Sequence, residues 1–201
     1  GGIVTKQAYR DYRLVAEFRW GLLTWGKRTD RARDSGILLH AQGRPGNTRK
    51  DFNGPWMRSI EFQIIEGGVG DIIVVNGYDD SGELVQPALT VPSRKDRDGE
   101  SVWDAKGEPV VFRKGRINWY GRSEDWQDRL GFRGPDDVEL PASGWNRLEA
   151  VARGGSLTYY VNGKIVNQGS GCSLSGGRII LQSEGAEVYF RRLDLEPLPK
   201  E

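Results

Sequence analysis

Glu61 and Gln63 lie two residues apart in the stretch RSIEFQIIE, residues 58–66. Side chains along a β-strand alternate between its two faces, so the apolar residues of this stretch would face one way and Glu61 and Gln63 the other. A spacing of two residues corresponds to about 7 Å along a strand. A carboxylate and an amide at that separation could hold the hydroxyl groups of a sugar-like ligand. The alternative is a solvated strand face that binds nothing.

The composition predicts a β-rich protein with many turns. The chain has 201 residues, and its 28 glycines and 9 prolines exceed the usual share, which suits short strands joined by turns. The formal net charge of +1 creates no field that would favour nucleic acid or an anionic membrane, so neither is expected as a partner. No apolar stretch is long enough to insert into a membrane. The single cysteine, Cys172, can form neither an intrachain disulfide nor a thiolate metal site.

Alternating hydrophobic patterns predict strands along most of the chain. Asn162-Gly163 separates two such runs and predicts a tight hairpin, because both turn residues need positive φ. No helix-period segment longer than about two turns is present. About ten short strands without helices predict an all-β sandwich, which we expect to be one domain over residues 1–201. The strands are expected at residues 12–20, 35–41, 60–65, 71–76, 145–153, 157–161, 164–167, 177–184 and 187–195.

Residues 77–144 interrupt this regular pattern and are expected to form a long insertion with a few short strands, one of them at 110–113. Trp119 and the other tryptophans of this segment could line a sugar cleft, since flat rings stack on the apolar faces of sugars. They could equally form a satellite core under the loop. Asp79, Asp80 and Glu83 resemble a calcium loop only faintly, and an acid-rich turn is expected there.

Six motifs in order resemble the 3-keto-disaccharide hydrolase family, over almost the whole chain apart from residues 77–144. The resemblance implies a concanavalin-like jelly-roll β-sandwich of two antiparallel sheets. It also implies an exported bacterial protein that acts on glycosides already oxidised at the sugar C3, although the family includes modules without demonstrated activity. The motifs are YRDYRLVAEFRW, RDSGILLH, RSIEFQIIEGGVGDI, SGWNRLEAVARGG, YYVNGKIVN and GRIILQSEGAEVYFRRLDLEPL.

Jelly rolls of this type bind sugars on the concave outer surface of one sheet, which suggests which residues would meet the substrate. Glu61 is expected to be catalytic, with His40 as its acid–base partner, at a position where the family commonly has arginine. The competing interpretation of His40 is a buried structural histidine. The residues expected to bind substrate are Gln63, Arg19, Glu17, Gln182, Arg191 and Trp119.

A 3-keto sugar would react by elimination. The C3 carbonyl acidifies the C2 proton, so a base can form an enolate, the C1 substituent can leave, and water can add back. His40, with an ordinary pKa near 6.5, suits either proton-transfer role, and Arg191 or Arg19 could stabilise the enolate oxygen. A direct mechanism with two carboxylates, Glu61 and Glu17, is a less favoured alternative.

Two further questions stay open at the level of the sequence. His40, Glu61 and Asp34 could hold a divalent metal ion that polarises the carbonyl, but their spacing shows no compact ligand pattern. A non-catalytic, lectin-like carbohydrate-binding module is the main alternative function, and it would bind sugar without forming product. A weaker alternative is a structural domain whose groove binds another protein.

Overall fold

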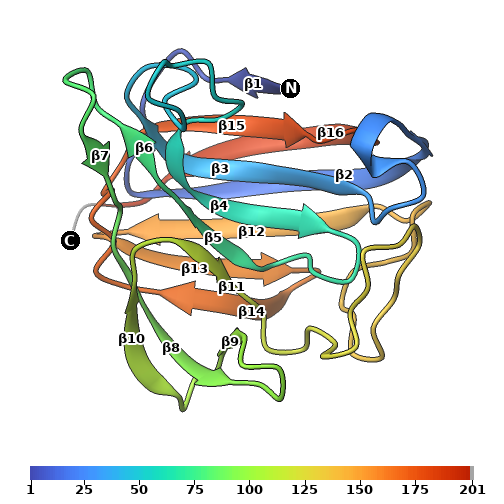
Figure 1. Ribbon diagram of the computed structural model, residues 1–201. Helices are drawn as coiled ribbons and strands as arrows, with labels where there is room; N and C mark the ends of the chain where they lie inside the picture. Colours follow the sequence, from blue (N-terminus) through green and yellow to red (C-terminus); the bar gives the residue numbers. More distant parts are fainter. Residues whose placement is uncertain (200–201) are drawn as a thin grey trace.

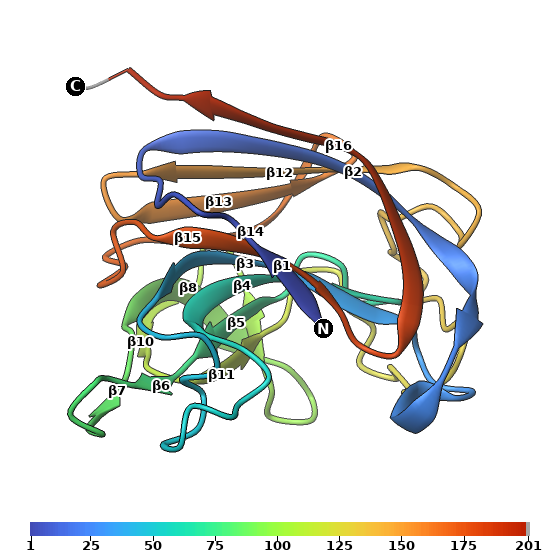
Figure 2. The same cartoon turned by 90° about the horizontal axis from the view of Figure 1, so that it is seen from above.

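The computed structural model describes residues 1–199, which form two facing antiparallel sheets (Figure 1). The six-stranded sheet, in spatial order, contains β1 (Gly2–Val4), β15 (Arg178–Ser183), β3 (Asp34–Gln42), β4 (Arg58–Ile65), β5 (Ile72–Val75) and β11 (Gly115–Ile117). The five-stranded sheet contains β14 (Lys164–Gly169), β13 (Ser156–Val161), β12 (Asn146–Arg153), β2 (Tyr12–Thr24) and β16 (Ala186–Pro197). Figure 2 shows the sheets as two layers. The predicted all-β jelly-roll sandwich is confirmed.

The core lies between the sheets and follows the alternation seen in the sequence. On β4, Ile60, Phe62 and Ile64 are all buried in the main hydrophobic cluster. Phe62 stacks on Tyr159 of the facing sheet, with ring centroids 4.2 Å apart and the planes nearly parallel. Such offset aromatic contacts add about 0.5–1.5 kcal/mol to the area that they bury. The polar residues of β4 are therefore turned to the outer face of the six-stranded sheet.

The predicted hairpin at Asn162-Gly163 is confirmed. It joins β13 to β14, and its two residues have φ values of 50° and 83°. These are the positive values that a two-residue turn needs to match the right-handed twist of the strands. The Asn162 side chain also accepts a hydrogen bond from the backbone N–H of Arg147 at 2.9 Å, which ties the turn to β12.

Residues 77–144 contain more strand than the sequence indicated. They form a short hairpin from β6 (Gly77–Tyr78) and β7 (Leu84–Val85), and a three-stranded sheet in the order β10 (Glu108–Phe112), β8 (Leu89–Lys95) and β9 (Ser101–Trp103). At the β6–β7 turn, Asp79 Oδ1 accepts the backbone N–H groups of Ser81 and Glu83. This acidic segment is thus the turn that the sequence predicts, with its aspartate occupied by backbone donors.

The long irregular segment after β11 is anchored to the six-stranded sheet by Asp71, which is fully buried. Asp71 accepts the backbone N–H of Trp119 at 2.9 Å and pairs with Arg116 at 2.9 Å and with Arg122. Burying an unpaired carboxylate is costly, so these donors are what makes the position tolerable. Asp71 therefore holds the start of residues 118–145 in place.

Replacing Asp71 by alanine is expected to lower the free energy of unfolding by about 3–5 kcal/mol, because two guanidinium groups and a backbone N–H lose their acceptor. Urea unfolding followed by tryptophan fluorescence measures the change. Asp98→Ala is the matched control, since the Asp98 side chain is 53% exposed and pairs only at the surface. Equal stability of the two variants would show that Asp71 is not the anchor.

Candidate functional site

Glu61, Gln63 and Gln182 lie together on the outer face of the six-stranded sheet. Gly36 of β3 pairs with Gln63 on one side and with Gln182 on the other, while Glu61 pairs with Leu38. A Cβ atom at position 36 would come within 2.6 Å of the Gln182 Oε1 atom and still closer to Oε1 of Glu61. The missing side chain at Gly36 thus leaves the space that these two oxygens occupy.

Glu61 is a buried acid without a partner. Only 5% of the residue is exposed, and its carboxyl group makes no hydrogen bond within residues 1–199. Burial, together with a smaller effect of the nearby acids Asp34 and Glu184, raises the pKa of Glu61 to about 8 against an opposing effect of Arg116. Glu61 is consequently a neutral carboxylic acid at pH 7, with a proton available for transfer.

Asp34, at the start of β3, is the second buried acid of this face. Gln63 Nε2 donates a hydrogen bond to its Oδ1 at 2.6 Å, and Arg28 forms an ion pair with its Oδ2. Burial raises the pKa of Asp34 to about 7, although the positive charge of Arg28 opposes this increase. Gln63 is therefore committed to orienting Asp34.

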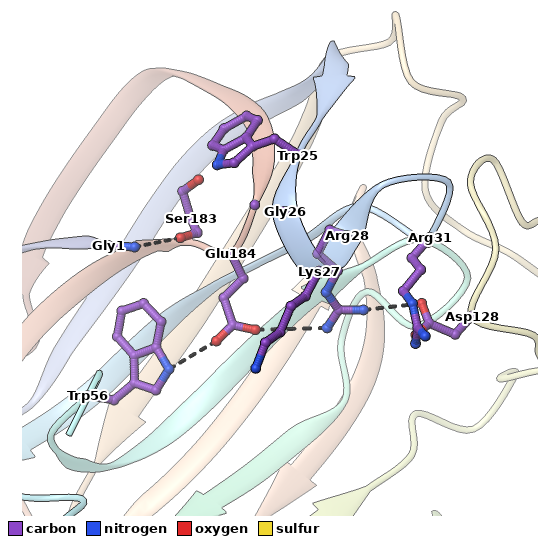
Figure 3. A pocket seen from close by; sticks show the side chains of 11 residues that line it. Gly1, Trp25, Gly26, Lys27, Arg28, Arg31, Trp56, Asp128, Ser183 and Glu184 are labelled. Atoms are coloured by element: carbon purple, nitrogen blue, oxygen red, sulfur yellow. Dashed lines mark hydrogen bonds and ion pairs between the residues drawn. The ribbon is translucent and has the colours of Figure 1, made fainter.

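Arg28 connects three acidic side chains that come from distant parts of the chain, and Figure 3 shows two of them, Asp128 and Glu184. Besides Asp34, it meets Asp128 at 3.1 Å and Glu184 at 3.8 Å. Asp128 also pairs with Arg31 at 2.9 Å and accepts the backbone N–H of Ala32. The segment after β11 therefore contributes a carboxylate to this site, and that carboxylate orients Arg28.

A pocket of about 790 Å³ opens beside Arg28, and we call it the polar pocket. Its walls carry two indole rings, Trp25 and Trp56, on either side of Glu184 (Figure 3). Trp56 Nε1 donates a hydrogen bond to Glu184 Oε1 at 3.0 Å, and the residue Trp25 is 52% exposed. Flat apolar rings beside charged hydrogen-bonding groups suit a sugar, which has apolar faces and polar edges.

Glu61 is not part of the wall of this pocket but is linked to it by two routes. Gln182 Nε2 donates to Glu184 Oε1 at 3.3 Å, and the Oε1 atom of Gln182 lies beside that of Glu61 over Gly36. On the other side, Asp34 is paired with Arg28 of the wall. Glu61 therefore belongs to a buried polar layer directly behind the polar pocket.

The structure corrects the expectation that His40 shares a face with Glu61. His40 is the extra residue of a β-bulge, because β3 has one more residue than both neighbouring strands there, and its φ is +55°. Its side chain points between the sheets, where Nδ1 donates to the Leu174 carbonyl at 2.5 Å and the ring packs edge-on against Tyr12. Burial lowers the pKa of His40. His40 is thus a structural, interior histidine.

Glu17, Arg19 and Arg191 are also misplaced by the sequence-based expectation. They lie on the outer face of the five-stranded sheet, on the opposite side of the sandwich from Glu61. Arg191 pairs with Glu17 at 2.6 Å, and the Arg19 guanidinium lies 5.2 Å from the Trp145 ring centroid. This surface is a network of ion pairs and cation–π contacts, so Glu17 and Arg19 cannot meet a ligand bound at Glu61. Arg191 also borders a depression at the edge of the sandwich.

Trp119 and the suggested metal site are the remaining corrections. Trp119 is 1% exposed and packs in the main core, so its ring cannot reach a bound sugar and does not belong to a separate satellite core either. His40 cannot join Glu61 and Asp34 in one metal site, because the β-bulge turns it to the other side of β3. Within residues 1–199, the structure contains no group of three His, Cys, Asp or Glu side chains arranged to hold a metal ion.

The sequence analysis missed Trp25, Arg28, Trp56 and Glu184. Glu184 follows Gln182 by two residues, so the same alternation that placed Gln182 could have placed it on this face. Trp25 and Arg28 lie in segment 21–33, and Trp56 directly follows segment 43–55; both segments lack a periodic pattern and are expected to be loops. An aromatic residue in a polar loop was the available signal there.

A family model described as a 3-keto-alpha-glucoside-1,2-lyase-like domain matches residues 1–196. The chain belongs to this family. Membership supports a carbohydrate-active role, and the matched range includes residues 77–144. A search of curated proteins found no match.

The comparison with solved structures found similar structures at low sequence identity. A candidate glycosyl hydrolase from Parabacteroides distasonis is 16% identical, with a TM-score of 0.51 over 98% of this chain and 76% of that chain. The carbohydrate-binding module CBM66 from Bacillus subtilis is 10% identical, with a TM-score of 0.49 over 97% and 80% of the two chains. No helix within residues 1–199 is long and apolar enough to span a membrane.

Glu61→Gln is expected to make the protein more stable at high pH. The folded-state pKa of Glu61, about 8, exceeds the ordinary 4.5, so wild-type stability falls as pH rises through this window, while the neutral glutamine loses nothing. At about pH 9 the variant should gain on the order of a few kcal/mol in urea unfolding, and below about pH 4 the difference should vanish.

Glu187→Gln is the control for this measurement. Glu187 is half-buried, but its hydrogen bond with Tyr189 lowers its pKa, so its replacement should give no gain at high pH. Equal stability of the Glu61→Gln variant and the wild type at pH 9 would mean that the Glu61 carboxyl is not buried in its neutral form.

Proposed function

We propose that this protein cleaves 3-keto-glycosides by elimination followed by hydration. The observation that carries the proposal is the neutral, unpartnered carboxyl group of Glu61, held behind a pocket that is lined by Trp25, Trp56 and Glu184. A buried acid that makes no hydrogen bond lowers stability, and such groups concentrate at functional sites. Membership of the 3-keto-alpha-glucoside-1,2-lyase-like family supports the substrate class.

The reaction requires a base, an acid and a cation. A base removes the C2 proton, whose acidity is raised by the C3 carbonyl, and the electron pair moves into an enolate. The enolate then re-forms the C3 carbonyl and expels the C1 substituent, and the oxygen of that leaving group takes up a proton. A double bond between C1 and C2 remains. Water adds across this bond, with hydroxyl at C1 and a proton at C2, so the net change is hydrolysis.

The residues of the site can fill these roles. Glu61, being neutral at pH 7, supplies the proton for the leaving oxygen; because it lies in the layer behind the polar pocket, this transfer requires the leaving oxygen to reach Glu61 past Gln182. Glu184, whose carboxylate faces the polar pocket, accepts the C2 proton. Arg28 lies between the acidic side chains and offers positive charge to the enolate oxygen.

Direct displacement with Glu17 as the second carboxylate is not proposed, because Glu17 lies on the outer face of the other sheet. Arg28 likewise takes the role that the sequence suggested for Arg19 or Arg191. Trp25 and Trp56 take the stacking role suggested for Trp119.

A non-catalytic carbohydrate-binding module is the second candidate. It is favoured by the pairing of Glu184 with Trp56 and Arg28, because a carboxylate engaged by two protein donors is well suited to fix a binding surface. Such a module would bind sugars whether or not C3 is oxidised, and it would form no product.

Glu61→Gln is expected to lower kcat on 3-keto-trehalose and on a simple 3-keto-glucoside by about 10²–10⁴-fold, because the amide cannot donate the acidic proton. Release of 3-ketoglucose measures the rate, and circular dichroism checks the fold. Glu187→Gln should retain wild-type turnover. Full activity of the Glu61→Gln variant would end the catalytic assignment, and binding without product in the wild type would favour the module.

The pH dependence gives a separate prediction. Because the active form of Glu61 is protonated, kcat should fall as pH rises through about 8, and the fall should be absent from the residual rate of the Glu61→Gln variant. His40→Gln should leave this descending limb in place while lowering the melting temperature, since His40 is interior. A rate that increases through pH 8 would contradict the role of Glu61 as the acid.

A further inference from the structure

A second depression lies next to the polar pocket, at the open edge of the sandwich. It lies between β1, the edge strand of the six-stranded sheet, and β16, the edge strand of the five-stranded sheet (Figure 2). Its volume is about 770 Å³, and we call it the apolar groove. The apolar side chains of its wall are Ile3, Trp25, Leu181, Val188, Phe190 and Leu193.

The rim of this groove exposes apolar side chains to solvent. Ile3 is 76% exposed, Trp25 52% and Leu193 43%, while Leu181 and Phe190 form a floor that packs against the main core. Large exposed side chains gathered around a concave surface indicate a binding site more strongly than the same residues scattered singly.

The charged residues of the groove do not offset its apolar character. Arg191 and Arg192 belong to the wall, but Arg191 pairs with Glu17 at 2.6 Å and Arg192 with Asp194 at 2.5 Å. Their guanidinium groups are thus neutralised by partners on their own sheet. A ligand in the groove would meet mainly hydrocarbon and aromatic surface, with Gln182 and Ser183 as the uncharged polar side chains of the wall.

The groove continues into the polar pocket. Both are lined by Gly1, Trp25, Ser183 and Gly185, so the Trp25 ring borders both spaces. The polar pocket holds Arg28 and Glu184 on the other side of that ring (Figure 3). One molecule with a polar end and an apolar end can therefore occupy both at once.

We propose that the apolar groove binds the aglycone of the substrate, and that this aglycone is an aryl or alkyl group. The inference rests on the proposed function, which places the sugar in the polar pocket. A second sugar in the groove would leave the hydroxyl groups that lie beside Leu181, Val188 and Phe190 without partners, which is unfavourable. An aromatic or aliphatic group would instead bury the exposed surfaces of Ile3 and Leu193.

The test compares the 3-keto forms of phenyl glucoside and methyl glucoside. The wild type should show a kcat/KM about tenfold higher for the phenyl compound, because burying one aromatic ring stabilises the bound state by at least the free energy that a tenfold change requires. The double variant Ile3→Ser/Leu193→Ser should lose most of this preference while keeping its rate on the methyl compound. Leu84→Ser is the matched control, because Leu84 is 51% exposed on β7, outside the groove.

Binding separates this inference from the proposed function. Calorimetric dissociation constants for the same two compounds are measured on the Glu61→Gln protein, with and without the groove substitutions. Tighter phenyl binding that is lost with Ile3→Ser/Leu193→Ser but kept with Leu84→Ser supports the groove, even if no variant shows turnover. Equal affinities for the two compounds, or no binding of either, overturn it, even if both are cleaved.

Discussion

The buried carboxyl group of Glu61 depends on a gap in its own sheet. Gly36 of β3 lies between Gln63 of β4 and Gln182 of β15. The side chain that glycine lacks leaves the space that the Oε1 atoms of Glu61 and Gln182 occupy. Without a hydrogen-bond donor from the protein, the carboxyl group is stable there in its protonated form. The chemistry proposed for the site follows from this one constraint.

Charge balance then determines how the rest of the site is arranged. Three carboxylates surround Arg28, and each comes from a different segment: Asp34 from β3, Glu184 from the end of β15 and Asp128 from the segment after β11. Burial is the main cause that raises the pKa of Asp34 and of Glu61, and the negative charge that Arg28 does not neutralise adds to it. Residues 118–145 thus contribute to the electrostatics of the pocket through Asp128.

The strands and the sandwich were predictable from the sequence, because alternation, turn residues and the Asn162-Gly163 hairpin are local signals. Alternation also placed Glu61, Gln63 and Gln182 on one face of their sheet. It could not indicate which sheet a strand joins, and for that reason Arg19 and Arg191 were expected on the wrong side. It also could not reveal the bulge at His40, where one extra residue reverses the direction of the side chain.

The state of the Glu61 carboxyl group is the claim on which this account rests, and its titration can be observed directly. Carbon-13 NMR of the glutamate side-chain carboxyls, with the Glu61 signal identified by its absence from the Glu61→Gln spectrum, follows the group through the pH range. We expect the titration of the Glu61 carboxyl group to have its midpoint near pH 8. A midpoint near the ordinary value of 4.5 would show an ionised carboxylate at neutral pH and would contradict the assignment of Glu61 as the proton donor.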